Sequence, residues 1–275
     1  MSTSSIAIRQ ENYRFLQEHV YSQAGIVLED DKHYLFECRL APIVRQLGLG
    51  SINDLCVLLM TAEEAEVGRQ VVEAMTTNET YFFRDPAHYD AIRSALLPRL
   101  KQERQDTRKL RFWSAAASTG QEAYSLAMLL IEEKLSDWNI QILGTDFSSQ
   151  VVERARAGKY QQIEVNRGLP AALLVKHFSR AGMDWQLREA VRRMVCFEPI
   201  DLRKSMCALG PFDLVFCRNV MIYFDTETKK KILKELHGTL FRGGWLMLGG
   251  AETALGVEEW FDKQTIENAT VYVAR

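Results

Sequence analysis

The chain has 275 residues, of which 47% are hydrophobic and 25% charged, and its formal net charge is −2. That length can bury a sizeable core in one large domain or two, the near-neutral charge gives no reason to expect nucleic-acid binding, and no apolar run approaches the roughly 18 residues of a membrane-spanning helix. Five scattered cysteines without a CxxC pair, and an N-terminus without a signal pattern, favour a soluble cytoplasmic protein with reduced thiols.

The first 75 residues are predicted to be helical throughout. Apolar side chains recur every three or four positions up to Gly25, which suits a helix C-terminus, and a later stripe contains Pro42, which predicts a kink or a split. The module holds six Lys/Arg and eleven Asp/Glu, so any basic face on it must be local. We expect about four helices, around residues 13–21, 36–47, 51–54 (a capping box that opens a short helix) and 63–75.

From Leu110 the pattern changes to strands alternating with helices, which implies a mostly parallel sheet covered on both faces. A helix is expected after Gly120, another from Ser148, and a third around 226–240 that ends at Gly243-Gly244. Strands are expected, in chain order, at residues 110–116, 140–145, 194–197, 212–217 and 245–248, with a closing hairpin at about 261–266 and 270–274.

Residues 177–193 fit this alternation poorly, and two short strands around 181–184 predict a small β insertion there. The expected fold class is therefore α/β. A Rossmann-like domain over residues 76–275 carries a small antiparallel β-subdomain inserted at about 177–193, and an all-α domain over residues 1–75 precedes it.

The turn after the first predicted strand has features of a cofactor site. A parallel sheet binds its ligand outside the carboxyl ends of its strands, and Gly120 lets the backbone approach that ligand closely. Glu122 would repel the phosphates of a dinucleotide but attract a cation, such as the amino group or sulfonium of S-adenosylmethionine. The three-glycine fingerprint of dinucleotide binders is absent. The alternative is a plain strand-to-helix turn.

Polar residues at other points extend this candidate site. Asp146 ends the second predicted strand, where a carboxylate typically accepts hydrogen bonds from both ribose hydroxyls, unless it is only a helix N-cap. Arg218-Asn219 follows the fourth strand. The amide suits an amino acid group and the guanidinium suits a carboxylate, unless the arginine is a surface residue. Asn78, Thr80 and Arg84 precede the first strand, where a segment can fold over the pocket mouth or form only a capped loop.

Other chemistries find little support. The five histidines have no metal-ligand spacing, and neither a Gly-x-Ser-x-Gly elbow nor a phosphate-binding loop occurs, so we expect no metal. No general base stands out either. Methyl transfer to a carboxylate needs none, because a glutamate with a pKa near about 4.3 is already ionised at neutral pH. Positioning in a dry pocket should then dominate catalysis.

Four stretches of the chain closely resemble the CheR family, the chemoreceptor glutamate O-methyltransferases. They read MTTNETYFFR at 75–84, WSAAASTGQE at 113–122, TD at 145–146 and FCRNVMIYF at 216–224. They span most of the chain in order, and the first and last are long and uncommon. The resemblance implies a helical domain joined to a Rossmann-like methyltransferase domain. It also implies transfer of methyl from S-adenosylmethionine to receptor glutamates, with S-adenosylhomocysteine as the second product.

The resemblance also implies roles for individual residues. Arg84 and Tyr223 would lie beside the transferred methyl, although Tyr223 taken alone could equally be a core aromatic. Asp201 stands where the family frequently has an amide, which leaves its adenine contact open, and Gln121 stands where Glu is common. The implied cofactor-binding set is Asn78, Thr80, Arg84, Glu122, Asp146, Asp201, Leu202, Arg218 and Asn219.

The implied partner is the helical, acidic methylation region of a chemoreceptor, which predicts a basic docking face in the helical domain. Lys32 and Arg39 are seven residues apart and share a helix face, and Arg45 joins them only if Pro42 rotates it. The loop Ala181–Asp184 is shorter than in family members that grip a receptor's C-terminal tether peptide, so we expect no dependence on such a tether. We further expect a monomer, without direct membrane insertion or nucleic-acid binding.

Two other functions stay open at this stage. The chain could methylate a receptor of a non-chemotaxis signalling pathway or another acidic protein. It could instead be a sensor or scaffold that binds S-adenosylmethionine without turnover. The presence of both Arg84 and Tyr223 counts against the second of these.

Overall fold

The computed structural model describes residues 7–61, 65–135, 137–254 and 256–275. Contacts between Cα atoms divide these residues into two compact units. One comprises the described part of Met1–Thr77 together with Tyr223–Thr226, and the other comprises Asn78–Ile222 and Glu227–Arg275. Each unit has its own core.

The smaller unit is helical, as the sequence predicts. Gly25 ends the first helix in the left-handed conformation, and its N–H donates to the Tyr21 carbonyl at 2.7 Å. The second helix runs unbroken through Pro42, where a kink or split is expected. Glu63 and Glu64, with which the fourth helix is expected to begin, lie outside the described residues. The helices are α1 (Gln10–Ala24), α2 (His33–Gln46), α3 (Ile52–Thr61) and α4 (Ala65–Met75).

The larger unit is built on a sheet that, within the described residues, has seven strands in the order β6-β2-β1-β7-β8-β10-β9. Strands β6 to β8 are parallel, whereas β10 is antiparallel to both β8 and β9. This confirms the predicted α/β, Rossmann-like class. The strands are β1 (Lys109–Ala115), β2 (Asn139–Asp146), β6 (Val195–Pro199), β7 (Phe212–Cys217), β8 (Leu240–Leu248), β9 (Phe261–Ile266) and β10 (Ala269–Ala274).

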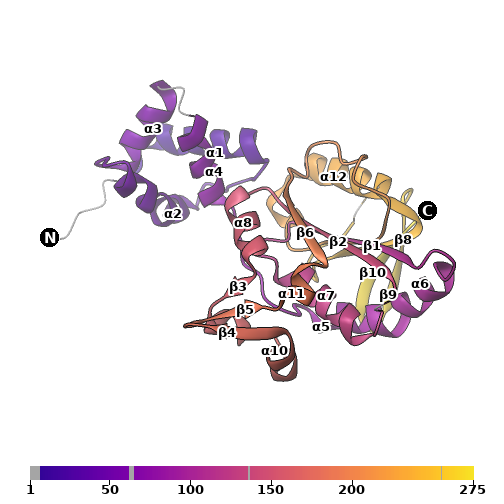
Figure 1. Cartoon of the computed structure of the whole chain (residues 1–275). Helices are drawn as coiled ribbons and strands as arrows, with labels where there is room; N and C mark the ends of the chain where they lie inside the picture. Colours follow the sequence, from indigo (N-terminus) through magenta and orange to yellow (C-terminus); the bar gives the residue numbers. More distant parts are fainter. Residues whose placement is uncertain (1–6, 62–64, 136, 255) are drawn as a thin grey trace. The chain divides into compact units, whose positions relative to one another are not determined.

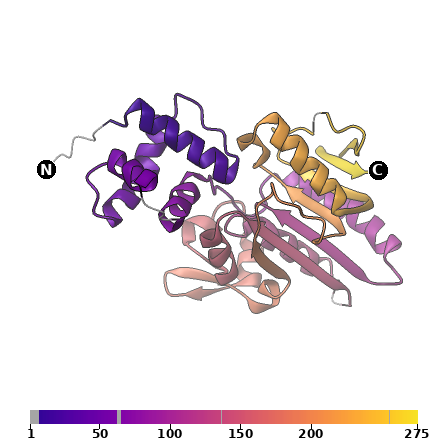
Figure 2. The same cartoon turned by 90° about the horizontal axis from the view of Figure 1, so that it is seen from above.

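Helices cover the sheet on both faces. Helix α7 lies on one face and α12 on the other (Figure 1), and the view from above shows α12 crossing its face of the twisted sheet (Figure 2). None of the helices in the described ranges is long and apolar enough to cross a membrane. The helical elements are α5 (Pro86–Ala91), the π-helix η1 (Ile92–Leu96), α6 (Leu97–Glu103), α7 (Gln121–Glu132), α8 (Ser149–Ala157) and α12 (Thr226–Gly238).

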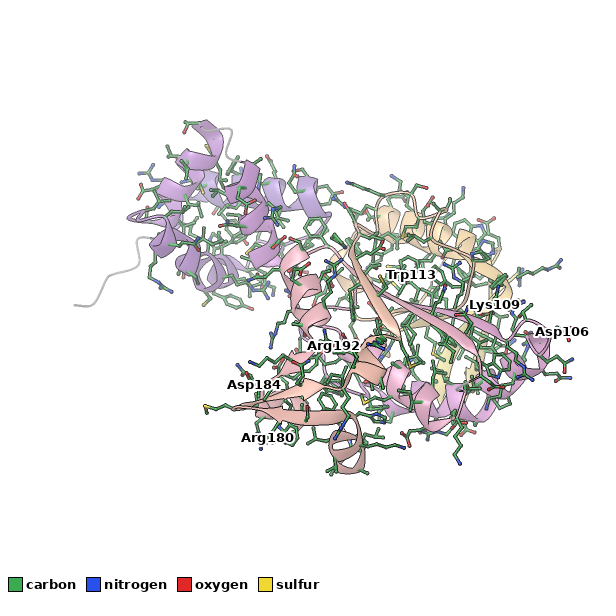
Figure 3. All side chains as sticks on the ribbon, in the orientation of Figure 1. Asp106, Lys109, Trp113, Arg180, Asp184 and Arg192 are labelled. Atoms are coloured by element: carbon green, nitrogen blue, oxygen red, sulfur yellow. The ribbon has the colours of Figure 1, made fainter. Side chains whose placement is uncertain are left out.

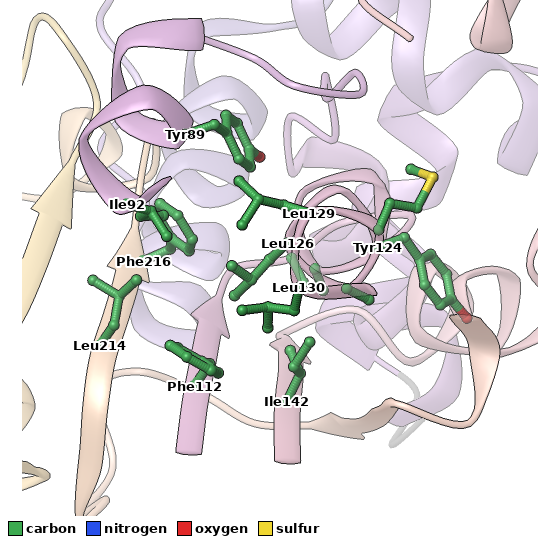
Figure 4. Close-up of a cluster of buried hydrophobic side chains, with 14 of the residues drawn as sticks. Tyr89, Ile92, Phe112, Tyr124, Leu126, Leu129, Leu130, Ile142, Leu214 and Phe216 are labelled. Carbon is green, nitrogen blue, oxygen red and sulfur yellow. The ribbon is translucent and has the colours of Figure 1, made fainter. Parts of the chain in front are cut away.

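The main core lies between α7 and the central strands (Figure 4). Leu126, Leu129 and Leu130 of α7 are at most 1% exposed and face strand side chains such as Phe112 and Leu214. Burying an aliphatic or aromatic side chain of this size contributes about 1.5–3 kcal/mol. This packing fixes the turn that joins β1 to α7, from which the candidate site is built.

A second, three-stranded antiparallel sheet has the order β3-β5-β4. The insertion begins earlier than the expected residue 177, because β3 pairs with β5. Ala181 pairs with Asp184, so Gly182 and Met183 alone form the turn between β4 and β5. Arg180 and Asp184 mark the two strands of this hairpin (Figure 3). The elements are β3 (Lys159–Tyr160), α9 (Gln162–Val165), α10 (Ala171–His177), β4 (Phe178–Ala181), β5 (Asp184–Leu187) and α11 (Glu189–Arg192).

Candidate active site

The turn between β1 and α7 is left-handed at several positions. Gly120 has φ 92°, and a Cβ there would lie 3.0 Å from both Ala155 Cβ and Phe197 Cζ. Ala116 and Ser118 also have positive φ, 59° and 51°. A left-handed conformation costs about 1–2 kcal/mol at a residue with a Cβ. Such conformations cluster at ligand-binding sites, where the surrounding structure enforces them.

Asp146 holds this turn against the end of β2. Its Oδ2 accepts a hydrogen bond from Ser118 N at 2.9 Å and its Oδ1 one from Ser148 N at 3.1 Å. The residue is 8% exposed. The carboxylate is therefore fixed at the carboxyl end of β2, next to the Gly120 turn, at the edge where parallel sheets bind their ligands.

Residues 78–84, which we call the lid segment, pack on the same turn. The Ser118 hydroxyl donates to the Asn78 carbonyl at 2.8 Å, and Phe83 N donates to the Ser125 hydroxyl at 2.9 Å. Phe82 is fully buried and makes edge-to-face contacts with Tyr160 of β3 and with Phe178 of β4. The lid segment is therefore anchored to the small sheet through Phe82.

Gly168 should be essential to this support. Its φ is 78°, and a Cβ there would lie 2.0 Å from the carbonyl oxygen of Phe82. We expect Gly168→Ala to displace the lid segment and to weaken binding of S-adenosylhomocysteine at least about tenfold, a loss of about 1.4 kcal/mol. Calorimetry with that ligand measures the effect.

Gly182→Ala is the matched control. Gly182 also has a left-handed φ, 68°, but a Cβ there meets nothing within 4 Å. Both variants therefore carry the cost of a left-handed alanine, and only Gly168→Ala carries the clash. Equal affinities in the two variants would mean that the contact with Phe82 does not matter for binding.

Arg218 is the centre of a buried ion-pair network beneath the lid segment. Its side chain is 1% exposed, and it forms ion pairs with Glu122, at 2.8 Å, and with Asp85. It also donates to the Arg84 carbonyl at 2.9 Å. Burial alone would lower the pKa of the Arg218 guanidinium, but attraction to Glu122 and Asp85 keeps this pKa above its usual value. The arginine is thus not the surface residue that the sequence left possible.

Both carboxylate oxygens of Glu122 accept hydrogen bonds. Oε1 accepts from the Ser114 hydroxyl at 2.7 Å and Oε2 from Arg218 at 2.8 Å. Near this network, burial and the charge of Arg218 lower the pKa of His88 to about 4, so its imidazole is neutral at neutral pH. Within the described ranges no group of histidine, cysteine or acidic side chains could hold a metal ion.

The other predicted residues have different surroundings. Asn219 has a left-handed φ of 57° directly after Arg218. The Asp201 carboxylate pairs with the Arg203 guanidinium at 2.7 Å, and Leu202 beside it is buried. Tyr223 ends a short 3-10 helix (η2, Met221–Tyr223) and groups with the helical unit, where its carbonyl accepts from Val27 N at 2.9 Å.

The three predicted docking cations differ in their hydrogen-bond and ion-pair partners. Arg39 donates to the Met75 and Thr76 carbonyls, at 2.7 and 3.1 Å, and so closes the end of α4. Lys32 precedes α2 and pairs with Asp31 at 3.2 Å. Arg45 is exposed on the last turn of α2.

One buried acid near the site escaped sequence reasoning. Glu252, 7% exposed, accepts hydrogen bonds from three backbone N–H groups in the turns after β7 and β8. The sequence pattern that could have indicated Glu252 is weak. An acid follows two glycines at the carboxyl end of a predicted strand, the position at which Asp146 is recognised.

The mostly parallel sheet, the glycine turn after β1 and the acid that ends β2 are together the architecture of S-adenosylmethionine-dependent methyltransferases. The chain matches "CheR methyltransferase, SAM binding domain" over residues 78–270 and "CheR methyltransferase, all-alpha domain" over residues 11–76. It therefore belongs to the CheR methyltransferase family, and it is an enzyme that uses S-adenosylmethionine.

Curated relatives with similar sequences match this chain over nearly its full length. A chemotaxis protein methyltransferase of Vibrio parahaemolyticus is 36% identical over 98% of both chains. Another, of Pseudomonas aeruginosa, is 37% identical over 91% of this chain and 93% of its own. The Escherichia coli protein is 32% identical, with 98% and 93% covered. A solved magnesium protoporphyrin IX methyltransferase from Synechocystis with bound S-adenosylmethionine is 14% identical, covers 79% of this chain and 93% of its own, and has a TM-score of 0.37.

Proposed function

We propose that this enzyme transfers methyl from S-adenosylmethionine to glutamate side chains in the cytoplasmic helical region of a chemoreceptor. The products are glutamate methyl esters and S-adenosylhomocysteine. The family membership of both units supports this proposal. The observation that carries it is the fixed Asp146 carboxylate beside the left-handed turn at Gly120, because this pair suits the ribose of the methyl donor.

The donor supplies a methyl group on a positively charged sulfur. An oxygen of the acceptor carboxylate attacks the methyl carbon while the carbon–sulfur bond breaks, and the bonding electrons stay on sulfur. Anion and cation become two neutral products, so no proton has to move and no base is required. The task of the chain is to align the three atoms and to exclude water. The lid segment, with Arg84 stacked 5.5 Å from the Tyr81 ring centroid, is suited to that task.

Radiolabelled methyl transfer to a receptor fragment tests the proposal. The label should appear on protein and be released by mild base, because esters are base-labile and N-methyl groups are not. Stable label would indicate N-methylation. Ligand binding without any label on a panel of the organism's receptors would favour a sensor or scaffold instead. The same panel distinguishes a chemoreceptor from a receptor of another pathway.

Tyr223 is proposed to act beside the transferred methyl. We expect Tyr223→Phe to lower kcat about tenfold or more while the Kd for S-adenosylhomocysteine changes little, the pattern of a group that acts mainly in the transition state. Steady-state kinetics and calorimetry measure the two quantities. Unchanged turnover would make Tyr223 a packing residue.

We also propose that the enzyme methylates its receptor without a C-terminal tether. The two-residue turn Gly182-Met183 supports this, since it leaves no long loop between β4 and β5 to enclose a peptide. An immobilised aromatic-acidic pentapeptide should therefore retain no enzyme. Capture with micromolar affinity would refute tether independence.

Docking through the helical unit is proposed to use Lys32 and Arg45 more than Arg39, whose guanidinium donates hydrogen bonds at the end of α4. Because the net charge of residues 1–75 is negative, this basic docking face is local.

We further propose a cytoplasmic monomer.

A further inference from the structure

Glu252 connects two turns that are far apart in the sequence. Its Oε2 accepts hydrogen bonds from Asn219 N at 2.6 Å and from Gly249 N at 2.8 Å, and its Oε1 accepts one from Ile222 N at 3.3 Å. Its own N–H donates to the Gly249 carbonyl at 2.8 Å. The bond to Gly249 only closes a local turn. The other two tie the turn after β8 to the segment after β7, 33 and 30 residues away in the sequence.

The segment after β7 has an unfavourable backbone conformation that the hydrogen bonds to Glu252 can stabilise. Asn219 has a left-handed φ of 57°, which costs about 1 kcal/mol at a residue with a side chain. Its N–H and that of Ile222, which lies inside η2, both point to the Glu252 carboxylate. One side chain therefore fixes the start and the end of residues 219–222. Tyr223 is the next residue and completes η2.

The neighbouring glycine gives independent support. A Cβ on Gly249 would lie 2.7 Å from Asn219 Nδ2 and 2.7 Å from Glu252 Oε2. The Asn219 amide and the Glu252 carboxylate thus both lie against Gly249, and a side chain at that position would have to displace one or both of them. At Gly250, the next residue, a Cβ would meet nothing within 4 Å. The close approach is specific to the position that faces Asn219.

We propose that Glu252 is a positioning residue for methyl transfer: its carboxylate holds the backbone of Asn219 and Ile222, directly before Tyr223, in the geometry that binds the donor. This rests on the proposed function for the roles of Asn219 and Tyr223. It does not require Glu252 to touch either substrate. Misplacement of a reacting group by about 1 Å can cost about 100-fold in rate, so loss of this carboxylate should appear in turnover.

The experiment compares Glu252→Ala and Glu252→Gln with the wild-type enzyme. The alanine variant should lower kcat about 100-fold and raise the Kd for S-adenosylhomocysteine about tenfold. The glutamine variant keeps one acceptor oxygen but presents an NH₂ group toward the other donor, and its losses should be intermediate. Glu259→Gln, on an exposed side chain in the same loop, should match the wild type.

Gly249→Ala and Gly250→Ala form a second matched pair. The first should reproduce the losses of Glu252→Ala in direction, whereas the second should leave kcat and Kd unchanged. A merely structural role would lower the melting temperature of the Glu252 variants and leave kcat and Kd of the folded protein at their wild-type values. That result, or equal effects at Gly249 and Gly250, would overturn the proposal.

The two readouts separate this inference from the proposed function. If the wild-type enzyme forms no methyl ester on any receptor, the proposed function fails, but the ligand Kd of the Glu252 variants still tests the positioning of Asn219. If esters form and the Glu252 variants bind the ligand and turn over like the wild type, only the positioning role fails.

Discussion

Replacing Asp146 by alanine is expected to weaken binding of S-adenosylhomocysteine by about 100- to 10,000-fold. The ribose would lose two hydrogen bonds to a charged acceptor, each contributing about 1.5–3 kcal/mol, and each 1.4 kcal/mol corresponds to a factor of ten. Isothermal calorimetry measures this effect directly. Wild-type affinity in the variant would remove Asp146 from the site.

Two further variants separate ligand contact from support of the turn, because Asp146 also accepts from Ser118 N and Ser148 N. Asp146→Asn keeps the size and one acceptor oxygen but presents an NH₂ group toward one of the two backbone donors, so its losses of affinity and of melting temperature should both be smaller than those of the alanine variant. Asp137→Asn changes an exposed acid just before the opposite end of β2 and should leave ligand affinity unchanged. A loss of affinity that follows the melting temperature across these variants would indicate support of the turn alone.

The positions of Asp146 and of the main strands could be predicted because they depend on local sequence. A strand buried on both faces of a parallel sheet is a short apolar run bounded by turn residues, and Phe212–Cys217 has the predicted bounds. The ligand edge then follows from topology, since the carboxyl ends of parallel strands share one edge. Asp146 stands at that edge by its place in the sequence alone.

Features that depend on pairing between distant segments could not be predicted. Gly243-Gly244 is the predicted end of a helix, but α12 ends at Gly238 and the two glycines lie within β8. There β8 shifts register against β7, and a Cβ on Gly244 would lie 2.8 Å from the Phe241 carbonyl. Two glycines are consistent with either structure until the partner strand is known.

The ion-pair partners of the charged residues likewise could not be predicted from the sequence. Arg218 and Glu122 are 96 residues apart, and neither position signals the other. Composition and spacing made each of them a candidate for the pocket. They did not indicate that the cation and anion neutralise each other, or that Asp85 adds a second carboxylate to Arg218.

Replacing Arg218 by methionine is expected to lower the free energy of unfolding by about 3–5 kcal/mol, the cost of removing one partner from a buried ion pair. Glu122 is 8% exposed, and without the guanidinium the Ser114 hydroxyl would be its only side-chain hydrogen-bond donor among the residues that the structure describes. The Arg84 carbonyl would lose its donor as well. Urea unfolding, read as a shift of the midpoint at constant slope, measures the loss.

Arg275→Met provides the comparison, because the ion pair of Arg275 with Asp262 is about half exposed on both sides. Exposed pairs contribute at most about 1 kcal/mol, so the same chemical change should have little effect there. Adding Glu122→Leu to Arg218→Met should restore part of the lost stability, since a hydrophobic pair of similar volume removes the unpaired buried charge.

The restored double variant should nevertheless remain inactive if the network serves the site. Arg218 holds the backbone of Arg84 at the end of the lid segment, and methionine cannot donate that hydrogen bond. Recovered stability with a weakened affinity for S-adenosylhomocysteine would show that the buried charges serve the site, by contact with the ligand or by the placement of the lid segment, and not folding alone. Recovery of both would mean that the ion pair contributes to folding alone, and the lid segment would then depend on Phe82 and Gly168 for its placement.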